Sequence, residues 1–562
     1  GGAQIEALAR INGSDTNLDP NWDNKWYSEV THGDSVWYIE MAIPFRTLRY
    51  NPENTMWGIN FVRNDMKSNV YSSWNQVPVN LNTIDLGYTG QMFWDSPPPT
   101  IKNGSVNVIP YVSGSVNKDF ETNTPNNWDG NVGADAKVAL SSALNLDLTI
   151  NPDFSTVDVD VQQTNLTRFN LFFPERRGFF QENSDLFTSF GLQTINPFFS
   201  RRIGLEDGEA IPIVFGARLT GNVSEKLRIG LMNVQTASAS GINPQNFGVG
   251  AIQQRLGSRS SINGLFVNRQ STSSDENQEQ EDFNRVGALQ LNLMSPDGKL
   301  AADLGFQKSI NPENLKQEEY YSGTLRYNSK RIFTRLTAHH VGRDFIVDGG
   351  FVPRLYNYDA ALDTTIRRQF TQLAYLFVYN FFPKSGPFNL HGPRFSSTYV
   401  LNPNGSINGS FDGLFYYWNF KNQNEMEIRV TLDRDNLPFD SFIAGEIPFP
   451  AANYTYPGAG FFFNTNPRKK LSSFSNMAYG EFFSGERFSF TERIRFRVQP
   501  WGNFSISYTL NEISLPENLD STTLHLLGIT NEISFSNRMF WTTFIQYNTQ
   551  LENVNINSRF QW

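Results

Sequence analysis

The sequence predicts an all-β protein whose main part is a large antiparallel transmembrane β-barrel. Three observations indicate this fold class. Runs of alternating apolar and polar residues recur from residue 104 to the end of the sequence, with no second composition between them. Aromatic residues gather near the ends of these runs, as at 416–418, 461–463 and 540–541. Such aromatic groups are typical of strands that end at a membrane surface.

The alternating runs are expected to be long strands. In 488–498 the apolar residues and the three arginines occupy alternate positions, so they face opposite sides of a strand. The same alternation recurs in 144–150, 426–432, 504–510 and 554–562. A soluble β-sandwich is the alternative, but its strands usually have about five or six residues and its apolar face meets a second sheet. The longer runs favour a tilted bilayer crossing.

The length of the region from 104 to 562 sets the size of the barrel. At roughly 20 residues for each strand and its connection, it predicts about 18–24 strands. Side chains alone cannot fill the lumen of a barrel that wide. The lumen must therefore hold water or a folded plug.

Composition excludes several functional classes. The 562 residues carry a net charge of −9, which argues against a nucleic-acid partner because no basic stripe faces the phosphates. The chain has no cysteine, so disulfides and thiolate metal sites are absent. No apolar run reaches the roughly 18 residues of a transmembrane helix. We expect no cofactor.

Residues 1–95 form a region of different character. They contain six of the 11 tryptophans in short β-runs, which suggests a small, partial β-sandwich. A Ser-Pro-Pro-Pro-Thr sequence opens 96–103, which reads as a stiff linker to the barrel. Trp22, Trp26 and Trp74 lie near Asn and Asp residues and are candidates for stacking on sugar rings, although tryptophan in a sandwich is more often part of the core.

Residues 151–210 break the strand pattern, and catalysis is one explanation. Glu175, Glu182 and Asp185 could supply the acid and base of a glycoside hydrolase. Neighbouring arginines, however, would lower a carboxyl pKa rather than raise it to the value of a general acid. No catalytic residue is therefore assigned.

A metal site is the second explanation for this segment. Asp158 and Asp160 alternate with valines and so share one strand face, with Asp153 just before them. Oxygen-rich groups of this kind can bind calcium. A polar strand facing the lumen accounts for the same pattern and is favoured, and the histidines are scattered, so no metal ligand is assigned.

A plug is the favoured explanation. The phenylalanines of 151–210 need burial, and its charged residues need partners. A lumen lined by Glu427, Arg429, Arg493, Arg495 and Arg497 would supply those partners. The charged residues assigned to this plug or constriction are Asp153, Asp158, Asp160, Arg168, Glu175, Arg176, Arg177, Glu182, Arg201 and Arg202.

Several motifs carry a family resemblance. They lie at 37–49, 57–64, Trp74, 151–154, 165–169, 172–176, 179–180 and 200–204. Together they resemble an uncharacterised family of Gram-negative outer-membrane proteins that joins a family-nine-type carbohydrate-binding domain to a C-terminal barrel. The resemblance implies that the chain starts inside the sugar-binding-like domain. It also implies that the barrel continues with a further hairpin past a segment like 558–562.

These observations lead to three functional hypotheses for an outer-membrane protein whose N-terminal domain lies in the periplasm. The first is a plugged or gated conduit for saccharides or other polar solutes. The second is a structural or assembly subunit that anchors a complex. The third is an enzyme acting on glycans. The expected partners are outer-membrane lipid, a saccharide, and other outer-membrane proteins or lipoproteins, with no nucleic acid.

Overall fold

The computed structural model describes most of the chain. The described residues are 8–12, 15–19, 26–45, 48, 50, 52–65, 70–78, 81, 83, 85–99, 105–118, 125–141, 143–154, 160–192, 195–206, 209–239, 241–272, 282–313, 315–443, 447–498, 501–517, 519, 521–536 and 539–562.

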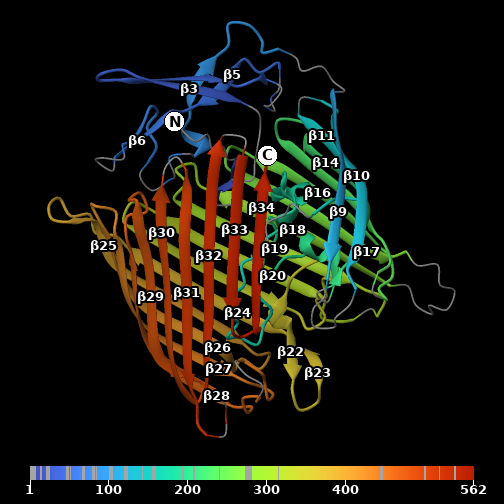
Figure 1. Cartoon of the computed structure of the whole chain (residues 1–562), viewed down its shortest axis with the longest axis vertical. Helices are drawn as coiled ribbons and strands as arrows, with labels where there is room; N and C mark the ends of the chain where they lie inside the picture. The colour runs from blue at the N-terminus through green and yellow to red at the C-terminus, as the bar shows by residue number, and fades with distance from the viewer. Residues whose placement is uncertain are drawn as a thin grey trace.

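A barrel wall makes up most of the structure (Figure 1). Within the described residues it consists of 22 antiparallel strands, a number inside the predicted range. Extended registers join each strand to the next, and the order closes with β34 beside β9. The wall strands are β9 (Ser105–Asn117), β10 (Asn127–Ala139), β11 (Leu144–Ile150), β14 (Ile213–Asn222), β15 (Leu227–Thr236), β16 (Gln245–Leu256), β17 (Ser260–Ser271), β18 (Phe283–Met294), β19 (Leu300–Ile310), β20 (Glu319–Asn328), β21 (Ile332–Val341), β24 (Phe370–Tyr379), β25 (Phe388–Leu401), β26 (Ile407–Phe420), β27 (Glu425–Asn436), β28 (Asn453–Asn464), β29 (Leu471–Phe482), β30 (Gly485–Val498), β31 (Gly502–Ser514), β32 (Thr522–Ser536), β33 (Met539–Asn548) and β34 (Asn553–Gln561).

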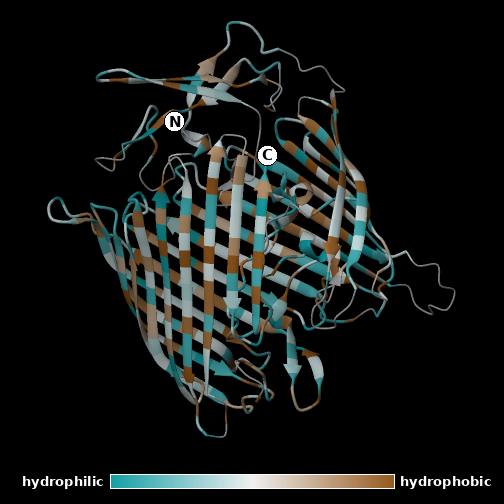
Figure 2. Cartoon of the chain, viewed as in Figure 1, coloured by the Kyte–Doolittle hydropathy of each residue, from teal (hydrophilic) through white to brown (hydrophobic). Residues whose placement is uncertain are grey.

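The strands alternate between two faces as the sequence predicts. In β18, Leu289 is 56% exposed, whereas the flanking Ala288 and Gln290 are buried. Figure 2 shows the resulting bands of hydrophobic and hydrophilic residues along the wall strands. Large apolar side chains such as Leu289 therefore lie on the outside of the barrel, and the flanking residues lie toward the lumen.

The two ends of the barrel differ in the length of their connections. Turns such as 223–226 and 329–331 close one end, which we call the short-turn end. The connections 151–212, 342–369 and 437–452 all leave the opposite end, the long-connection end. The antiparallel order places the start of β9 and the end of β34 at the short-turn end, where Figure 1 also shows the N-terminal strands.

The N-terminal region consists of short hairpins. Its described strands pair as β1–β2, β3–β4, β5–β8 and β6–β7, so no stack of two larger sheets is found among the described residues. A cluster of Phe45, Tyr50, Trp57 and Trp94 packs edge to face at its centre. The elements are β1 (Leu8–Asn12), β2 (Asp15–Asp19), β3 (Tyr27–His32), β4 (Trp37–Ala42), β5 (Met56–Ile59), β6 (Val62–Asp65), β7 (Val70–Ser73), η2 (Leu86–Tyr88) and β8 (Gly90–Phe93).

A buried ion pair attaches this region to the barrel. Arg259, in the turn between β16 and β17, donates to both carboxylate oxygens of Asp85 at 3.1 and 3.4 Å. Both side chains are less than a tenth exposed, and the guanidinium also covers the ring of Tyr88 at 5.2 Å. A side chain at Gly87 would overlap the Arg259 guanidinium and would have to displace it.

Replacing Arg259 should loosen the attachment. Arg259→Met leaves Asp85 buried without its partner, and losing one member of a buried pair costs about 3–5 kcal/mol. We expect proteinase K to release the N-terminal region faster, as followed by gel electrophoresis. Arg255→Met, which replaces an exposed arginine at the end of β16, is the control. Equal release rates for both variants and the parent would contradict the attachment.

Candidate functional site

Two connections of the long-connection end fold onto the inner wall of the barrel. We call residues 151–212 the first insert and residues 342–369 the second insert. Asn196 and Phe351 pair as an antiparallel bridge that joins the two inserts. Their elements are α1 (Gly178–Gln181), α2 (Asp185–Thr188), η3 (Ser200–Arg202), β12 (Leu205–Glu206) and β13 (Glu209–Ala210) in the first, and η4 (Pro353–Leu355), β22 (Tyr356–Asp359) and β23 (Thr364–Arg367) in the second.

The helices of the inserts are single turns. Among the described residues no helix has the length and apolar character needed to cross a membrane.

A hydrophobic core holds the inserts against one side of the lumen. Part of the inward face of β15 to β18 is apolar, unlike most of a barrel lumen, and it meets the buried phenylalanines of the first insert. Phe187 lies against Gly230 so closely that a side chain at this glycine would overlap its ring. The core includes Phe180, Leu186, Phe187, Phe190, Ile195, Phe198 and Ile203 from the first insert, Phe345, Val347, Val352 and Leu355 from the second, and Met232, Val234, Phe247, Val249, Leu265, Val267 and Val286 from the wall.

An ionic network fastens the first insert to β10, β11 and β14. Arg218 is 2% exposed and donates from Nη2 to Asp147 at 2.8 Å, with a Glu182 carboxylate oxygen 3.9 Å away. Lys137 pairs with the same Glu182 carboxylate. The Arg218 guanidinium also covers the ring of Phe179 at 5.3 Å. Two cations and two anions thus balance where the insert meets the wall.

A second pair lies inside the first insert. Arg177 donates to both oxygens of Glu175, at 2.9 and 2.7 Å, and its Nη1 and Nη2 reach the carbonyls of Ile203 and Ser200. Burial alone would raise the pKa of Glu175, but hydrogen bonds from Arg177 and Ser200 outweigh it and keep the pKa below its usual value. This pair ties α1 to η3.

The remaining charges predicted for the plug also find partners. Asp160 pairs with Arg201 and with Arg176, the latter at 3.4 Å. Arg168 crosses to β27, where Nη2 lies 3.8 Å from Asp435. Burial lowers the pKa of Arg168 to about 10, so its side chain stays charged at neutral pH. Asp153 is half-buried, and Asp158 lies outside the described residues.

The wall residues that pair with the first insert differ from those expected. The sequence pointed to Glu427 and to the arginines of 488–498, but Glu427 pairs with Arg394 of the wall. The insert instead pairs with residues such as Arg218 and Asp435, and Arg228 holds Asp185 at 2.8 Å. The apolar core of the insert lies beside β14 to β18, but Arg168 reaches β27 and the Gln162 N–H donates to Gln546 of β33.

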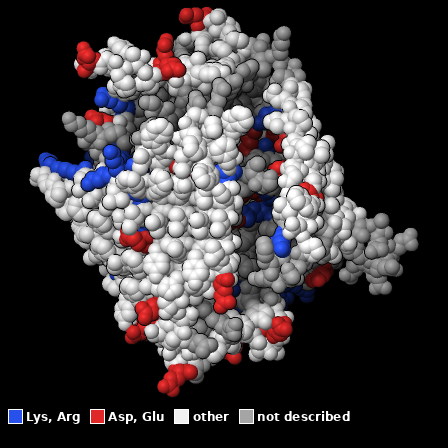
Figure 3. Space-filling model, viewed as in Figure 1, with Lys and Arg blue, Asp and Glu red and all other residues white. Residues whose placement is uncertain are grey.

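The opposite side of the lumen is exposed. In β30 the inward-facing Arg493 and Arg495 are exposed, and so are the outward-facing Ile494 and Phe496, at 45% and 47%. Figure 3 shows a hollow between β34 and β9 in which charged side chains are visible. Solvent therefore reaches both faces of this part of the wall.

Neither a catalytic pair nor a metal cluster is assembled in the part of the chain that the structure describes. Glu175, Glu182 and Asp185 each pair with a cation. No group of three or more His, Asp or Glu residues among the described ones is placed to hold a metal ion.

The tryptophans proposed for sugar stacking fall in different places. Trp74 is 62% exposed and packs its ring on Phe61 at 5.8 Å. Trp26 is half-buried, and Trp22 lies outside the described residues. Of the two proposed tryptophans that the structure describes, Trp74 is therefore the exposed one.

Sequence reasoning missed the second insert. Its signal is a break between the runs at 332–341 and 370–379, where Asp348-Gly-Gly is followed by Phe-Val-Pro-Arg354. Arg269, Asp348 and Tyr356 line a cavity together with the predicted Arg202. The spacing of these four residues in the sequence does not reveal the cavity, because they come from a wall strand and from both inserts.

Comparison with known proteins gives one family match. Residues 105–212 match the model of a domain of unknown function (DUF5916), which covers β9 to β11 and the first insert. No curated protein matches the sequence.

The Arg218 network can be tested by substitution. Arg218→Met leaves Asp147 and Glu182 with only Lys137, and loss of one member of a buried ionic group costs about 3–5 kcal/mol. We expect faster hydrogen–deuterium exchange in the first insert, with little change in β24 to β34. Arg495→Met, an exposed lumen arginine, should leave the exchange unchanged. Uniformly faster exchange across the barrel would contradict a local fastening role.

Acid should weaken the Glu175 pair. Because the folded-state pKa of Glu175 is lowered, its stabilisation is present above the ordinary glutamate pKa and is lost as the pH falls through the folded value. Thermal unfolding of the parent and of Glu175→Gln should therefore differ at pH 7 and converge toward pH 3. A difference that stays constant over this range would rule out the ionised pair as its source.

Proposed function

We propose that the protein is an outer-membrane β-barrel in which two inserts partly close a water-filled passage for polar solutes. The observation that carries this proposal is the asymmetry of the lumen. The inserts cover the inner face of β15 to β18, whereas the inner face of β30 is charged and exposed. A large barrel with an aqueous interior is the architecture of outer-membrane channels.

The outer surface supports the membrane assignment. Large apolar side chains are exposed around the wall, and a contiguous apolar surface of this extent is rarely left in water. Aromatic residues at 416–418, 461–463 and 540–541 lie near the short-turn end, as in an interfacial girdle. The exposed apolar residues include Leu231, Phe266, Leu289, Leu304, Leu325, Leu336, Leu414, Ile428 and Val430.

The lengths of the connections suggest an orientation. Outer-membrane barrels have short periplasmic turns and longer extracellular loops. By this rule the short-turn end faces the periplasm and carries the N-terminal region, and both inserts enter from the cell exterior. A solute arriving from outside would then meet the inserts first.

The way the inserts are held is compatible with a gate. Ion pairs such as Arg228–Asp185 and Arg168–Asp435 join the first insert to the wall, and their exposed edges can exchange partners with water. When a purely apolar contact separates, water cannot replace the lost partner in this way. We therefore favour a movable constriction over a permanent filling.

A structural or assembly role is the second candidate. The β3–β4 hairpin exposes apolar side chains on both faces, including Trp37 at 47% and Tyr38 at 65%. Such a surface suits contact with another outer-membrane protein or a lipoprotein. The open face of Trp74 leaves a saccharide as a further partner. A glycan-acting enzyme is the weakest candidate, because the acids of the first insert are ion-paired.

Single-channel conductance in planar bilayers tests the passage. The intact chain should be silent or show rare openings, and a variant lacking 155–205 should conduct steadily, because its lumen has lost the first insert. A variant lacking 273–281, a connection at the same end, is the matched control and should behave like the parent.

The barrel fold of each variant is checked by its shifted mobility on unheated gels. If the parent and both folded deletion variants stay silent, the passage is wrong and the assembly role is favoured. If the parent conducts steadily with both inserts in place, the inserts are not a constriction.

A further inference from the structure

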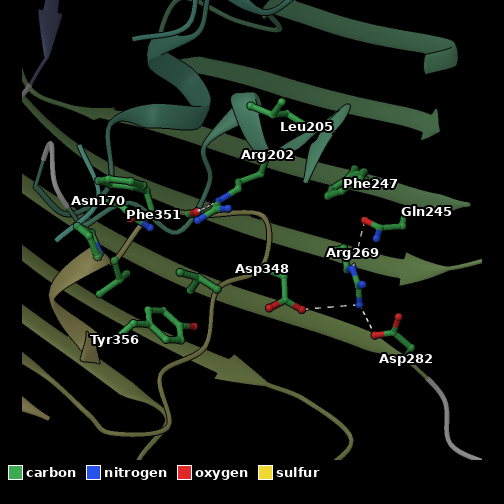
Figure 4. A pocket seen from close by; sticks show the side chains of 14 residues that line it. Asn170, Arg202, Leu205, Gln245, Phe247, Arg269, Asp282, Asp348, Phe351 and Tyr356 are labelled. Atoms are coloured by element: carbon green, nitrogen blue, oxygen red, sulfur yellow. Dashed lines mark hydrogen bonds and ion pairs between the residues drawn. The ribbon is translucent and has the colours of Figure 1, made fainter. Parts of the chain in front are cut away.

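A cavity lies where the two inserts meet the wall (Figure 4). Its volume is about 340 Å³, within the range of small-molecule sites. Arg202 enters it from the first insert, Asp348 and Tyr356 from the second, and Arg269 from β17. It lies near the long-connection end, since it is lined by the start of β16 and the end of β17.

The two arginines of the cavity are in different electrostatic situations. Arg269 pairs with Asp282 and lies 3.7 Å from Asp348, so both carboxylates of the lining contact this one guanidinium. Arg202 donates from Nε to the Gly350 carbonyl at 3.3 Å and pairs with no carboxylate among the described residues. Its guanidinium is therefore the cation of the lining that no carboxylate contacts, although the formal charges of the lining cancel.

The rest of the lining combines polar groups with apolar walls. Phe247 and Phe351 are 2% and 5% exposed and bound the cavity. Burial raises the pKa of Tyr356, so its hydroxyl stays a hydrogen-bond donor at neutral pH. The Asp348 carboxylate and the Asn170 amide add acceptors and donors on either side. Polar groups that converge on a concave site fix the orientation of its ligand.

We propose that this cavity binds a small solute that carries one carboxylate and several hydroxyl groups. Arg202 would hold the carboxylate through paired N–H donors, which is the geometry that guanidinium groups favour. Hydroxyl groups would donate to Asp348 and interact with Tyr356 and Asn170. A sugar acid and an open-chain hydroxy acid share this chemistry.

The ligand would also tie the inserts together. Arg202 and Asp348 belong to different inserts, and a solute that contacts both binds their joined arrangement more tightly than a separated one. Binding shifts an equilibrium only by this difference in affinity. The inference rests on the proposed function for the idea that the site controls a passage, but binding itself requires no conduction.

Isothermal titration of the full chain in detergent tests the site. The probes are D-galacturonate and D-gluconate. Two comparison compounds each lack one feature: D-galactose has no carboxylate, and acetate has no hydroxyl groups. We expect saturable binding of at least one hydroxy acid, at least tenfold tighter than either comparison compound. Arg202→Gln should weaken that binding at least tenfold, because it removes the guanidinium that would hold the carboxylate of the solute.

Arg343→Gln is the matched control, since Arg343 lies in the second insert, is exposed, and pairs with Asp344 outside the cavity. It should bind like the parent. The proposal is overturned if no hydroxy acid binds saturably, if galactose or acetate binds as well, or if both arginine variants lose binding equally. Conductance is recorded on the same preparations. A protein that binds the acid but does not conduct would refute the proposed passage and leave the binding site intact.

Discussion

The antiparallel hydrogen-bond ladder of the wall is the constraint on which the rest of the structure depends. Antiparallel registers join each wall strand from β9 to β34 to the next wall strand along the chain, so the backbone groups between them are paired. Twenty-two strands enclose more space than their own side chains fill. Material for the lumen must then come from the connections, and the first and second inserts supply it.

A local change in the inward residues decides where the inserts lie. Most barrel lumens are polar, but β15 to β18 present Val234, Phe247, Val249 and Val267 inward. Phenylalanines of the first insert cover them, which removes apolar surface from water on both partners. The exposed inner face of β30 has no such patch, so the apolar core of the inserts lies on one side of the barrel.

Ion pairs set the position of the first insert on the wall more narrowly than the apolar contact does. The apolar contact is non-directional, whereas Arg218 with Asp147 and Glu182 sets the position of the insert relative to β11 and β14. Removing a buried charge from its partner is costly, so these pairs oppose sliding of the insert along the wall. The same fixed position brings Arg202 beside the second insert, where it remains without a carboxylate partner among the described residues.

The sequence by itself determined the wall and the location of one insert. Alternation in runs such as 488–498 is a local property with a period of two, so it predicted the strands, their outward face and the size of the barrel. The break at 151–210 and its phenylalanines indicated a segment that needs burial. Both conclusions depend on residues that are neighbours in the chain.

Only the tertiary structure decided which groups meet. Asp147 and Arg218 are 71 residues apart, and Arg202 and Gly350 are 148 apart. Their contact follows from the curvature and register of the barrel, which no local pattern encodes. For this reason the first insert could be recognised in the sequence, while its partners were assigned to the wrong strands and the cavity between the inserts was not foreseen.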